Sequence, residues 1–286
     1  MSVRIAIPKG HLEADSTRLL QDSGIGVVGG GGRELFAKTN DPEIELVFVR
    51  AEDIPDFVAG GSTDLGITGH DLVREKNVDV VELLDLKFGY TRMVLAAPET
   101  SGIRTPADLR PGLRVATEFP NLTLRYFREK GIDVNIIRVT GATEISPLIG
   151  VADLITDVVE TGYTLRVHGL RVVDVILEST ARLIANKQSL EEKRDKIEGI
   201  KLALESVTRA RGKKLVLMNV PEEKLEEIKR IMPGMAGPTV SKVEAAVPML
   251  AVQAVVEGSD VYRVIRLAKQ AGARDILVVP IERVVP

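Results

Sequence analysis

The chain has 286 residues and a mass of 31.1 kDa, with 44% hydrophobic and 28% charged residues, a composition typical of a soluble globular protein of two or three domains. Its 38 lysines and arginines and 41 aspartates and glutamates give a net charge of −3, so no basic surface for nucleic acid or membrane lipid is expected. The absence of cysteine excludes disulfides, thiolate metal sites and cysteine nucleophiles.

The amino-terminal residues, MSVRIAIPKG, enter a strand at once and lack the apolar core of a secretory signal. No apolar run approaches the roughly 18 residues that span a membrane. The histidines, His11, His70 and His168, are too scattered along the chain to form a metal-binding motif. A cytoplasmic protein is therefore expected.

The first element is an apolar, β-branched strand at 3–7, followed by a Pro-Lys-Gly-His loop and a helix at 13–22. Loops at the carboxyl ends of strands bind ligands in α/β folds. Lys9 is therefore a candidate phosphate contact, although it could equally be a solvated turn lysine. The four glycines at 29–32 do not match the spaced dinucleotide fingerprint and are interpreted as a mobile loop.

Two further strands precede charged residues. The strand at 45–49 ends at Arg50, and the strand and sharp turn at 64–69 lead to Asp71, a plausible N-cap of the next helix. In a parallel sheet such strand ends converge, so Arg50 and Asp71 are expected over one edge. The alternative role for Asp71 is helix capping alone.

The pattern shifts near residue 86, where a second small α/β domain is expected to begin. It contains strands at 92–97, 113–117 and 134–139, and the start of a helix at 143–150. Between them, Asn121 is a good cap for a helix that runs to residue 130, and its free N–H groups could face an anion.

The stretch from Glu144 to Leu165 ends in a strand at 154–159 and a Thr-Gly-Tyr-Thr turn. Gly162 allows consecutive N–H groups to point at one anion, and two flanking threonine hydroxyls add donors. Asp157 could accept hydrogen bonds from a ribose diol, so the stretch suits a ribose 5-phosphate. The alternative is an ordinary strand-to-helix turn with a threonine cap.

The rest of the chain is expected to contain a final strand of this domain at 172–178 and a long helical stretch at 180–211, bent near Asn186. Elements with the order β-α-β-β-α-β then follow, as in a ferredoxin-like domain. That domain has no cluster of acids, bases or nucleophiles, and is interpreted as a regulatory or assembly module.

Several segments together resemble the ATP phosphoribosyltransferase family, the first enzymes of histidine biosynthesis. They are the spaced pattern from Glu144 to Leu165 and the motifs RIAIPKGHL, RAEDIP, DLGITGHDLV and ATEFPNLTLRYF. The resemblance covers essentially the whole chain, and its third domain indicates the long form. It implies an α/β fold with two type II periplasmic-binding-protein-like catalytic lobes and a ferredoxin-like, ACT-like domain, at 1–88 (rejoined by 180–210), 89–179 and 212–286.

The resemblance implies that N1 of ATP displaces pyrophosphate from C1 of phosphoribosyl pyrophosphate, with inversion and with Mg²⁺ carried by the pyrophosphate rather than by a dedicated protein site. Three residues would be catalytic: Arg50, Asp71 and Glu144. Seven would bind substrate: Lys9, His11, Asp157, Thr161, Gly162, Tyr163 and Thr164. His11 stands where the family often has arginine, so the expected nucleotide contact differs here.

The resemblance also implies inhibition by histidine at a site between subunits, near Asn219, Met235, Thr239 and Asp275, although these could be ordinary loop residues. It implies a dimer that becomes a hexamer when inhibited, without a separate regulatory subunit. The competing interpretation is a cytoplasmic, non-catalytic small-molecule sensor, because the phrase G-x-x-D-L-G-I at 61–67 also occurs in periplasmic binding proteins.

Overall fold

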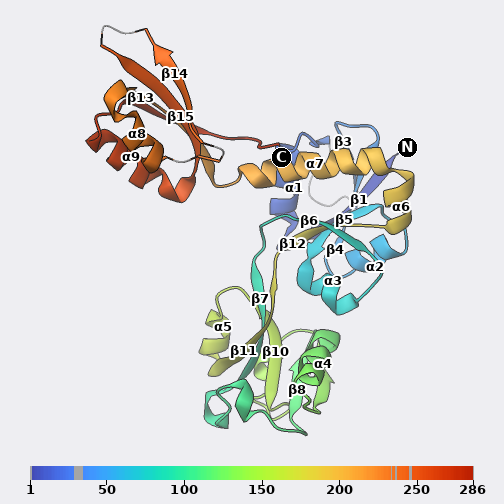
Figure 1. The fold of residues 1–286 in the computed structure, drawn as a ribbon. Helices are drawn as coiled ribbons and strands as arrows, with labels where there is room; N and C mark the ends of the chain where they lie inside the picture. Colours follow the sequence, from blue (N-terminus) through green and yellow to red (C-terminus); the bar gives the residue numbers. More distant parts are fainter. Residues whose placement is uncertain (1, 29–34, 233, 236, 245–246, 286) are drawn as a thin grey trace. The chain divides into compact units, whose positions relative to one another are not determined.

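The computed structural model describes residues 2–28, 35–232, 234–235, 237–244 and 247–285 (Figure 1). It divides into two compact units, Met1–Lys201 and Leu202–Pro286. Within the described residues, the first unit holds a seven-stranded and a five-stranded sheet, and the second unit a four-stranded sheet. The glycines at 29–32, interpreted above as a mobile loop, lie outside the described residues.

The seven-stranded sheet forms the first lobe of the first unit. In spatial order its strands are β2 (Val27–Val28), β3 (Phe36–Thr39), β4 (Ile44–Arg50), β1 (Val3–Lys9), β5 (Leu65–Gly69), β12 (Ala181–Ala185) and β6 (Val81–Asp85). β1 pairs in parallel with β4 on one side and with β5 on the other, so the carboxyl ends of these three strands lie at the same edge of the sheet.

Helices α1 (Glu13–Asp22), α2 (Ile54–Ala59) and α3 (His70–Lys76) connect these strands. Apolar residues of α2 and α3 pack on the buried face of the sheet, against Ala6 and Ile184. A side chain at Gly66 would place its Cβ 2.4 Å from Ile54 Cγ2. Glycine in β5 therefore permits the close approach of α2 to the sheet.

The second lobe contains the five-stranded sheet, in the order β11 (Leu170–Ser179), β7 (Thr91–Pro98), β10 (Leu154–Val159), β8 (Arg114–Thr117) and β9 (Asn135–Arg138). Alternate residues of its strands face opposite layers. Leu95 and Leu154 pack with α4 (Pro120–Glu129), whereas Val94 and Ile155 pack with α5 (Tyr163–Val167). Short 3₁₀ segments connect its strands: η1 (Glu99–Ser101), η2 (Pro106–Asp108) and η3 (Thr143–Ile145).

The chain passes from the first lobe to the second between β6 and β7, and it returns between β11 and β12 (Figure 1). The two crossing segments are paired, because Ala181 N donates to Phe88 O at 2.9 Å and Leu86 N donates to Ala181 O at 2.9 Å. This two-lobed α/β arrangement confirms the expected fold class.

Two helical expectations were wrong. Residues 181–185 form strand β12 between β5 and β6, and helices begin only with α6 (Lys187–Glu192) and α7 (Arg194–Ala210). A short apolar run does not distinguish strand from helix without its neighbours. The expected bend at Asn186 is an N-cap, whose side chain accepts from Ser189 N. Residues 143–150 form only η3, since Pro147 cannot donate a helical hydrogen bond.

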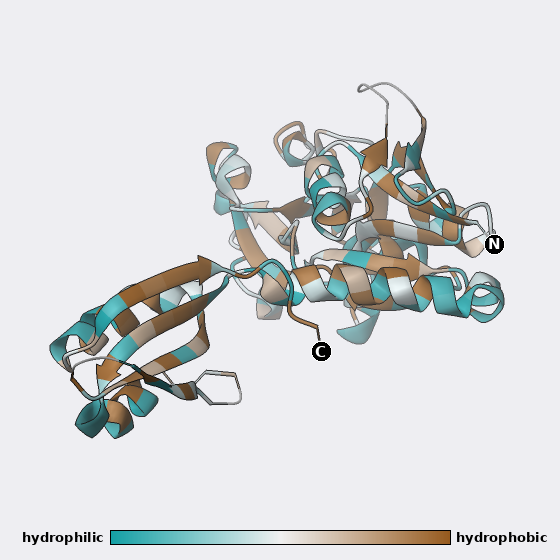
Figure 2. Cartoon of the chain, turned by 90° about the horizontal axis from the view of Figure 1, so that it is seen from above, coloured by the Kyte–Doolittle hydropathy of each residue, from teal (hydrophilic) through white to brown (hydrophobic). Residues whose placement is uncertain are grey.

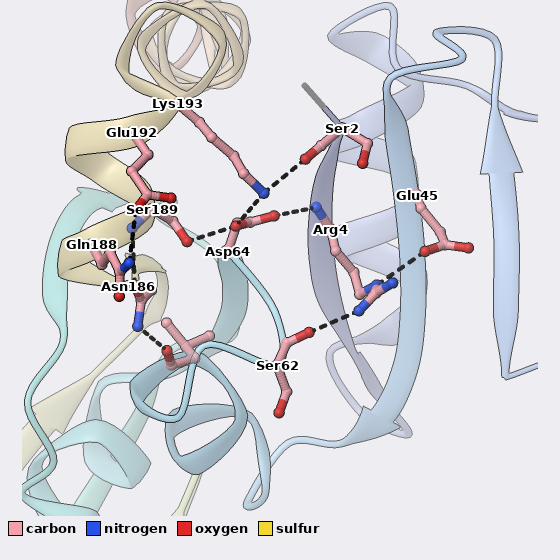
Figure 3. Close-up of polar contacts among 11 residues, drawn as sticks. Ser2, Arg4, Glu45, Ser62, Asp64, Asn186, Gln188, Ser189, Glu192 and Lys193 are labelled. Carbon is pink, nitrogen blue, oxygen red and sulfur yellow. Dashed lines mark hydrogen bonds and ion pairs between the residues drawn. The ribbon is translucent and has the colours of Figure 1, made fainter.

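A buried carboxylate ties α6, and the residue that joins it to α7, to the sheet of the first lobe (Figure 3). Asp64 accepts hydrogen bonds from the Arg4 N–H at 2.8 Å, from Ser189 Oγ at 2.6 Å and from Lys193 Nζ at 2.8 Å. Burial alone would raise the pKa of Asp64, but the bonds from Lys193, Ser189 and Arg4 outweigh it and hold that pKa below its usual value.

Replacing Lys193 by Met is expected to destabilise the protein by about 2–4 kcal/mol at pH 7, because Asp64 would be left buried without its cation. A carboxyl with a lowered pKa contributes stability above its unfolded pKa and loses it as pH falls through the folded value. The difference between Lys193→Met and wild type should therefore shrink below about pH 4. Urea denaturation at pH 7 and pH 3.5 measures this.

Lys187→Met is the matched control, because Lys187 pairs with Asp79 at an exposed position. Equal loss of stability in the two variants would contradict a special role for the Asp64 network.

The second unit has the element order β-α-β-β-α-β, which confirms the ferredoxin-like expectation. Val216, Met218 and Val220 alternate along one strand and pack under both helices. Hydrophobic stretches run along the strands of this unit in Figure 2. Its elements are β13 (Lys213–Pro221), η4 (Glu222–Lys224), α8 (Leu225–Ile231), β14 (Thr239–Val243), β15 (Met249–Glu257), η5 (Gly258–Asp260), α9 (Val261–Gln270) and β16 (Arg274–Pro280), with sheet order β14-β15-β13-β16. No helix among the described residues is long and apolar enough to cross a membrane.

Candidate functional site

Three of the residues singled out from the sequence lie at the carboxyl edge of the first sheet. Lys9 and Arg50 are register partners at the ends of β1 and β4, and Asp71 follows the end of β5 in the first turn of α3. The Arg50 side chain is 80% exposed, and its Nη1 lies 3.4 Å from Glu52 Oε1. This edge therefore presents two cations beside a carboxylate.

Asp71 is held by a residue that sequence reasoning missed. Its carboxylate accepts a hydrogen bond from Ser179 Oγ at 2.7 Å, and its N–H donates to the same oxygen at 3.1 Å. The expectation that Asp71 is the N-cap of the helix was wrong, since Gly69 occupies that position and no side chain caps α3. Asp71 is 8% exposed, so its carboxylate is fixed by this contact and by burial.

The Thr-Gly-Tyr-Thr turn joins β10 to α5. Gly162 is the N-cap of α5 with φ +70°, in the left-handed region, and a Cβ added there would meet no protein atom within 4 Å. Thr161 Oγ1 accepts from Tyr163 N at 3.3 Å. Thr161, Tyr163 and Thr164 are exposed. The turn thus combines a helix amino terminus, two threonine hydroxyls and open space at the glycine.

Two other carboxylates, those of Glu118 and Glu144, lie close enough to Asp157, near the end of β10, to influence its charge. Burial raises the pKa of Asp157 to about 6; the hydrogen bond from the Val158 N–H opposes this rise, and the negative charges of Glu118 and Glu144 add to it. Glu118 was not singled out from the sequence, because a lone glutamate after a strand has no distinguishing pattern. Among the described residues, no group of three His, Asp or Glu side chains is arranged to hold a metal ion.

Three buried threonines fix the backbone beside Asp157. The Oγ1 atom of Thr156 lies 2.6 Å from those of Thr117 and Thr123. Thr117 Oγ1 also accepts from Phe119 N at 2.8 Å, and Thr123 Oγ1 donates to Phe119 O at 2.7 Å. These bonds tie together β10, the end of β8 and the start of α4. From the sequence alone, such threonines indicate only strand propensity and helix starts.

His11 lies beside the phosphate-binding candidate turn. Its Nε2 is 3.1 Å from Oε1 of Glu160, the residue before Thr161, and both side chains are more than half exposed. The loop after β1 in the first lobe therefore contacts the loop after β10 in the second lobe.

The sequence suggested that the amino terminus of α4 has free N–H groups that could face an anion, but the structure shows these groups bonded to Glu75. The N–H groups of Asn121 and Leu122 donate to the two carboxylate oxygens of Glu75 at 3.0 and 2.9 Å, and Asn121 Nδ2 donates to Glu75 O at 3.0 Å. Phe119, not Asn121, is the N-cap. A carboxylate of the first lobe thus occupies the position expected for a ligand anion.

Of the four residues expected to sense histidine, Asn219 and Asp275 are in contact, and Met235 and Thr239 lie elsewhere in the second unit. Asn219 Nδ2 donates to Asp275 Oδ2 at 2.9 Å, beside an irregularity in the β13–β16 pairing where Asp275 has φ +49°. Met235 is 60% exposed and lines a cavity of about 240 Å³ with Lys213. Thr239 opens β14. Lys213 and Asn219 are six residues apart on β13, or about 20 Å.

Family models and known relatives together match nearly the whole chain. The family model described as ATP phosphoribosyltransferase matches residues 50–206, and the model described as HisG, C-terminal domain, matches residues 210–283. The ATP phosphoribosyltransferase of Methanothermobacter thermautotrophicus is 50% identical over 287 residues, covering 100% of both chains. That of Methanopyrus kandleri is 51% identical over 285 residues, covering 99% of this chain and 100% of its own.

Among solved structures, a chain of the ATP phosphoribosyl transferase (HisG:HisZ) complex from Thermotoga maritima matches with a TM-score of 0.62 and 31% identity. The match covers 71% of this chain and 98% of that chain. The present chain is therefore longer than this structural relative.

Proposed function

This chain belongs to the ATP phosphoribosyltransferase family of histidine biosynthesis and is therefore a pentosyltransferase, and we propose how its own residues transfer a phosphoribosyl group from phosphoribosyl pyrophosphate to N1 of ATP. The main evidence for this activity is the 50% sequence identity to the ATP phosphoribosyltransferase of Methanothermobacter thermautotrophicus over the full length of both chains.

The sugar phosphate binds at the end of β10. The turn from Thr161 to Thr164 holds the 5-phosphate through backbone N–H groups and hydroxyls, and Asp157 accepts hydrogen bonds from the ribose diol. The φ of +70° at Gly162 and the open space beside it support this role. In glycosyl transfer the reactants must be held in line while water is kept from the electron-poor sugar carbon.

The pyrophosphate and the nucleotide bind at the carboxyl edge of the first sheet. Lys9 and Arg50 stabilise the charge that develops on the departing pyrophosphate, because cations placed where charge appears lower the barrier. Asp71 and Glu144 position the reacting groups. His11 faces the nucleotide in place of the arginine common in the family and offers a stacking ring instead of a bidentate guanidinium.

The metal enters with the substrate. The family uses a metal, and we propose Mg²⁺, bound to the pyrophosphate oxygens of phosphoribosyl pyrophosphate. This assignment rests on the preference of Mg²⁺ for substrate phosphates and water over all-protein cages.

The activity is tested by incubating the protein with ATP, phosphoribosyl pyrophosphate and Mg²⁺ and detecting N1-(5-phosphoribosyl)-ATP and pyrophosphate. Formation of both products at equal rates is the expected result. Binding of the two substrates to folded protein without product would instead support the non-catalytic sensor.

The second unit is proposed to bind histidine as an inhibitor, between two copies of the chain. The Asn219–Asp275 pair offers a carboxylate for the amino group or imidazolium of the amino acid. Met235 lies toward the opposite end of the sheet, so two copies packed antiparallel would bring it to the partner's pair. We propose a dimer that becomes a hexamer on inhibition, without a separate regulatory subunit.

Replacing Asp275 by Ala is expected to raise the histidine concentration for half inhibition at least tenfold, because a charged hydrogen bond contributes about 1.5–3 kcal/mol. The uninhibited rate should stay within twofold of wild type. Glu226→Ala, an exposed change on α8, is the control. Equal inhibition of all three proteins would place the effector site elsewhere.

A further inference from the structure

Ser179 makes two hydrogen bonds to one residue, Asp71, which is 108 positions away in the chain. The hydroxyl donates to Asp71 Oδ1 at 2.7 Å and accepts from the Asp71 N–H at 3.1 Å. The two bonds fix both the backbone and the side chain of Asp71. The bond to the carboxylate involves Oδ1 and leaves Oδ2 able to accept a further hydrogen bond.

Ser179 is 2% exposed and Asp71 is 8% exposed, so water competes little for these bonds. In such surroundings a hydrogen bond to a carboxylate is strong and directional.

The absence of a side chain at Gly69 is a second, independent observation that supports this position of the Asp71 carboxylate. A Cβ at Gly69 would lie 2.2 Å from Asp71 Oδ1 and 3.7 Å from Ser179 Oγ. Gly69 has φ −69° and ψ 142°, a conformation open to any residue. Glycine is therefore required here for space, and that space is filled by the carboxylate bonded to Ser179.

Ser179 lies where the chain leaves the second lobe to return to the first. It is the last residue of β11, pairs with Thr91 at the start of β7, and precedes the segment in which the chain returns to the first lobe. The next residue, Thr180, accepts a hydrogen bond from His70 N at 3.0 Å. The crossing segment thus holds the first turn of α3 through two consecutive residues.

The other end of α3 is also fixed from the second lobe. Glu75, one turn after Asp71 and 8% exposed, accepts the hydrogen bonds from the first turn of α4. Helix α3, which carries Asp71, is therefore held by the crossing segment at its first turn and by α4 at its last turn.

From these contacts we propose that Ser179 is the positioning residue for Asp71 in phosphoribosyl transfer, with Gly69 providing the space that its geometry requires. This inference rests on the proposed role of Asp71 at the reacting groups. Ser179 itself does not touch substrate. It holds the carboxylate in the orientation that the reaction uses.

The test compares steady-state rates of Ser179→Ala and Ser179→Thr. Removal of the hydroxyl should lower kcat 10- to 100-fold, as for misplacement of a reacting group by about 1 Å, while the KM for phosphoribosyl pyrophosphate changes less than threefold. Ser179→Thr keeps the hydroxyl and should recover most of kcat. Gly69→Ala, which displaces the carboxylate but leaves Ser179 intact, should reproduce the loss of kcat.

Ser189→Ala is the matched control, because Ser189 donates a similar hydrogen bond to the buried Asp64 away from the site. It should lower the midpoint of thermal unfolding about as much as Ser179→Ala, without loss of kcat. Loss of kcat in Ser189→Ala equal to that in Ser179→Ala would overturn the inference.

A double-mutant cycle separates this inference from the role of Asp71. If Ser179 acts through Asp71, Ser179→Ala should change the residual rate of Asp71→Asn less than twofold. A full additional loss in the double mutant would overturn the inference while leaving the role of Asp71 intact. An Asp71→Asn variant with the wild-type rate would instead refute the role of Asp71 itself.

Discussion

Replacing Asp157 by Asn is expected to make the protein more stable and much less active at neutral pH. The folded pKa of Asp157 is about 6, against an ordinary value of 3.8 for an aspartate, chiefly because of burial. Ionised Asp157 therefore opposes folding: the stability present below pH 3.8 is lost as pH rises through 6. The shift corresponds to a cost on the order of 2 kcal/mol above pH 6. Asn removes this cost and can still accept from the Val158 N–H.

The gain in stability should be largest above pH 7 and should vanish near pH 3, where wild-type Asp157 is mostly protonated in both the folded and the unfolded state. Urea denaturation at pH 7.5 and pH 3 measures both limits. The same titration predicts that the wild-type KM for phosphoribosyl pyrophosphate rises as pH falls below about 6, because the protonated carboxyl is a weaker acceptor for the ribose diol.

The activity of Asp157→Asn should fall about 100-fold or more in kcat/KM, since hydrogen bonds to a charged group are worth about 1.5–3 kcal/mol each. Asp153→Asn is the matched control, because Asp153 pairs with Arg114 at 2.8 Å and the guanidinium holds the pKa of Asp153 below its usual range. That variant should lose stability at pH 7 and keep its activity. Lower stability of Asp157→Asn at pH 7.5 would contradict the buried-carboxylate argument.

Replacing Gly162 by Ala is expected to raise the KM for phosphoribosyl pyrophosphate at least tenfold. The added Cβ would meet no protein atom within 4 Å, so it would project into the space proposed for the 5-phosphate. Because Gly162 has φ +70°, alanine should also cost about 1–2 kcal/mol of stability. Initial rates at varied phosphoribosyl pyrophosphate, together with thermal unfolding, separate the two effects.

Gly131→Ala isolates the cost of backbone strain. Gly131 follows α4, has φ +69°, and also leaves an added Cβ without neighbours within 4 Å. It should lose similar stability and keep the wild-type KM. If Gly162→Ala likewise kept the wild-type KM, the turn would not be a phosphate site.

Local patterns predicted much of the fold. The β-branched runs ending at Lys9 and Arg50 form adjacent parallel strands in register, because strand propensity and burial act over a few residues. The order of elements in the second unit followed from alternating periods of hydrophobicity. Strand β12 could not be predicted, since its residues become a strand only between β5 and β6.

Some residues of the candidate site were likewise recognisable from local sequence, whereas others were identified only from the tertiary structure. Gly162 was recognisable from the sequence because its chemical requirement, a left-handed turn at a helix start, is met within a few residues. The sequence alone thus determined the family resemblance, the parallel strand ends and the glycine-containing turn at the start of α5, for which a phosphate-binding role is proposed. Only the tertiary structure decided that Ser179 holds Asp71 and that Glu75 caps α4, because a hydroxyl or carboxylate carries no sequence signal for a partner that folding brings to it from a distant segment.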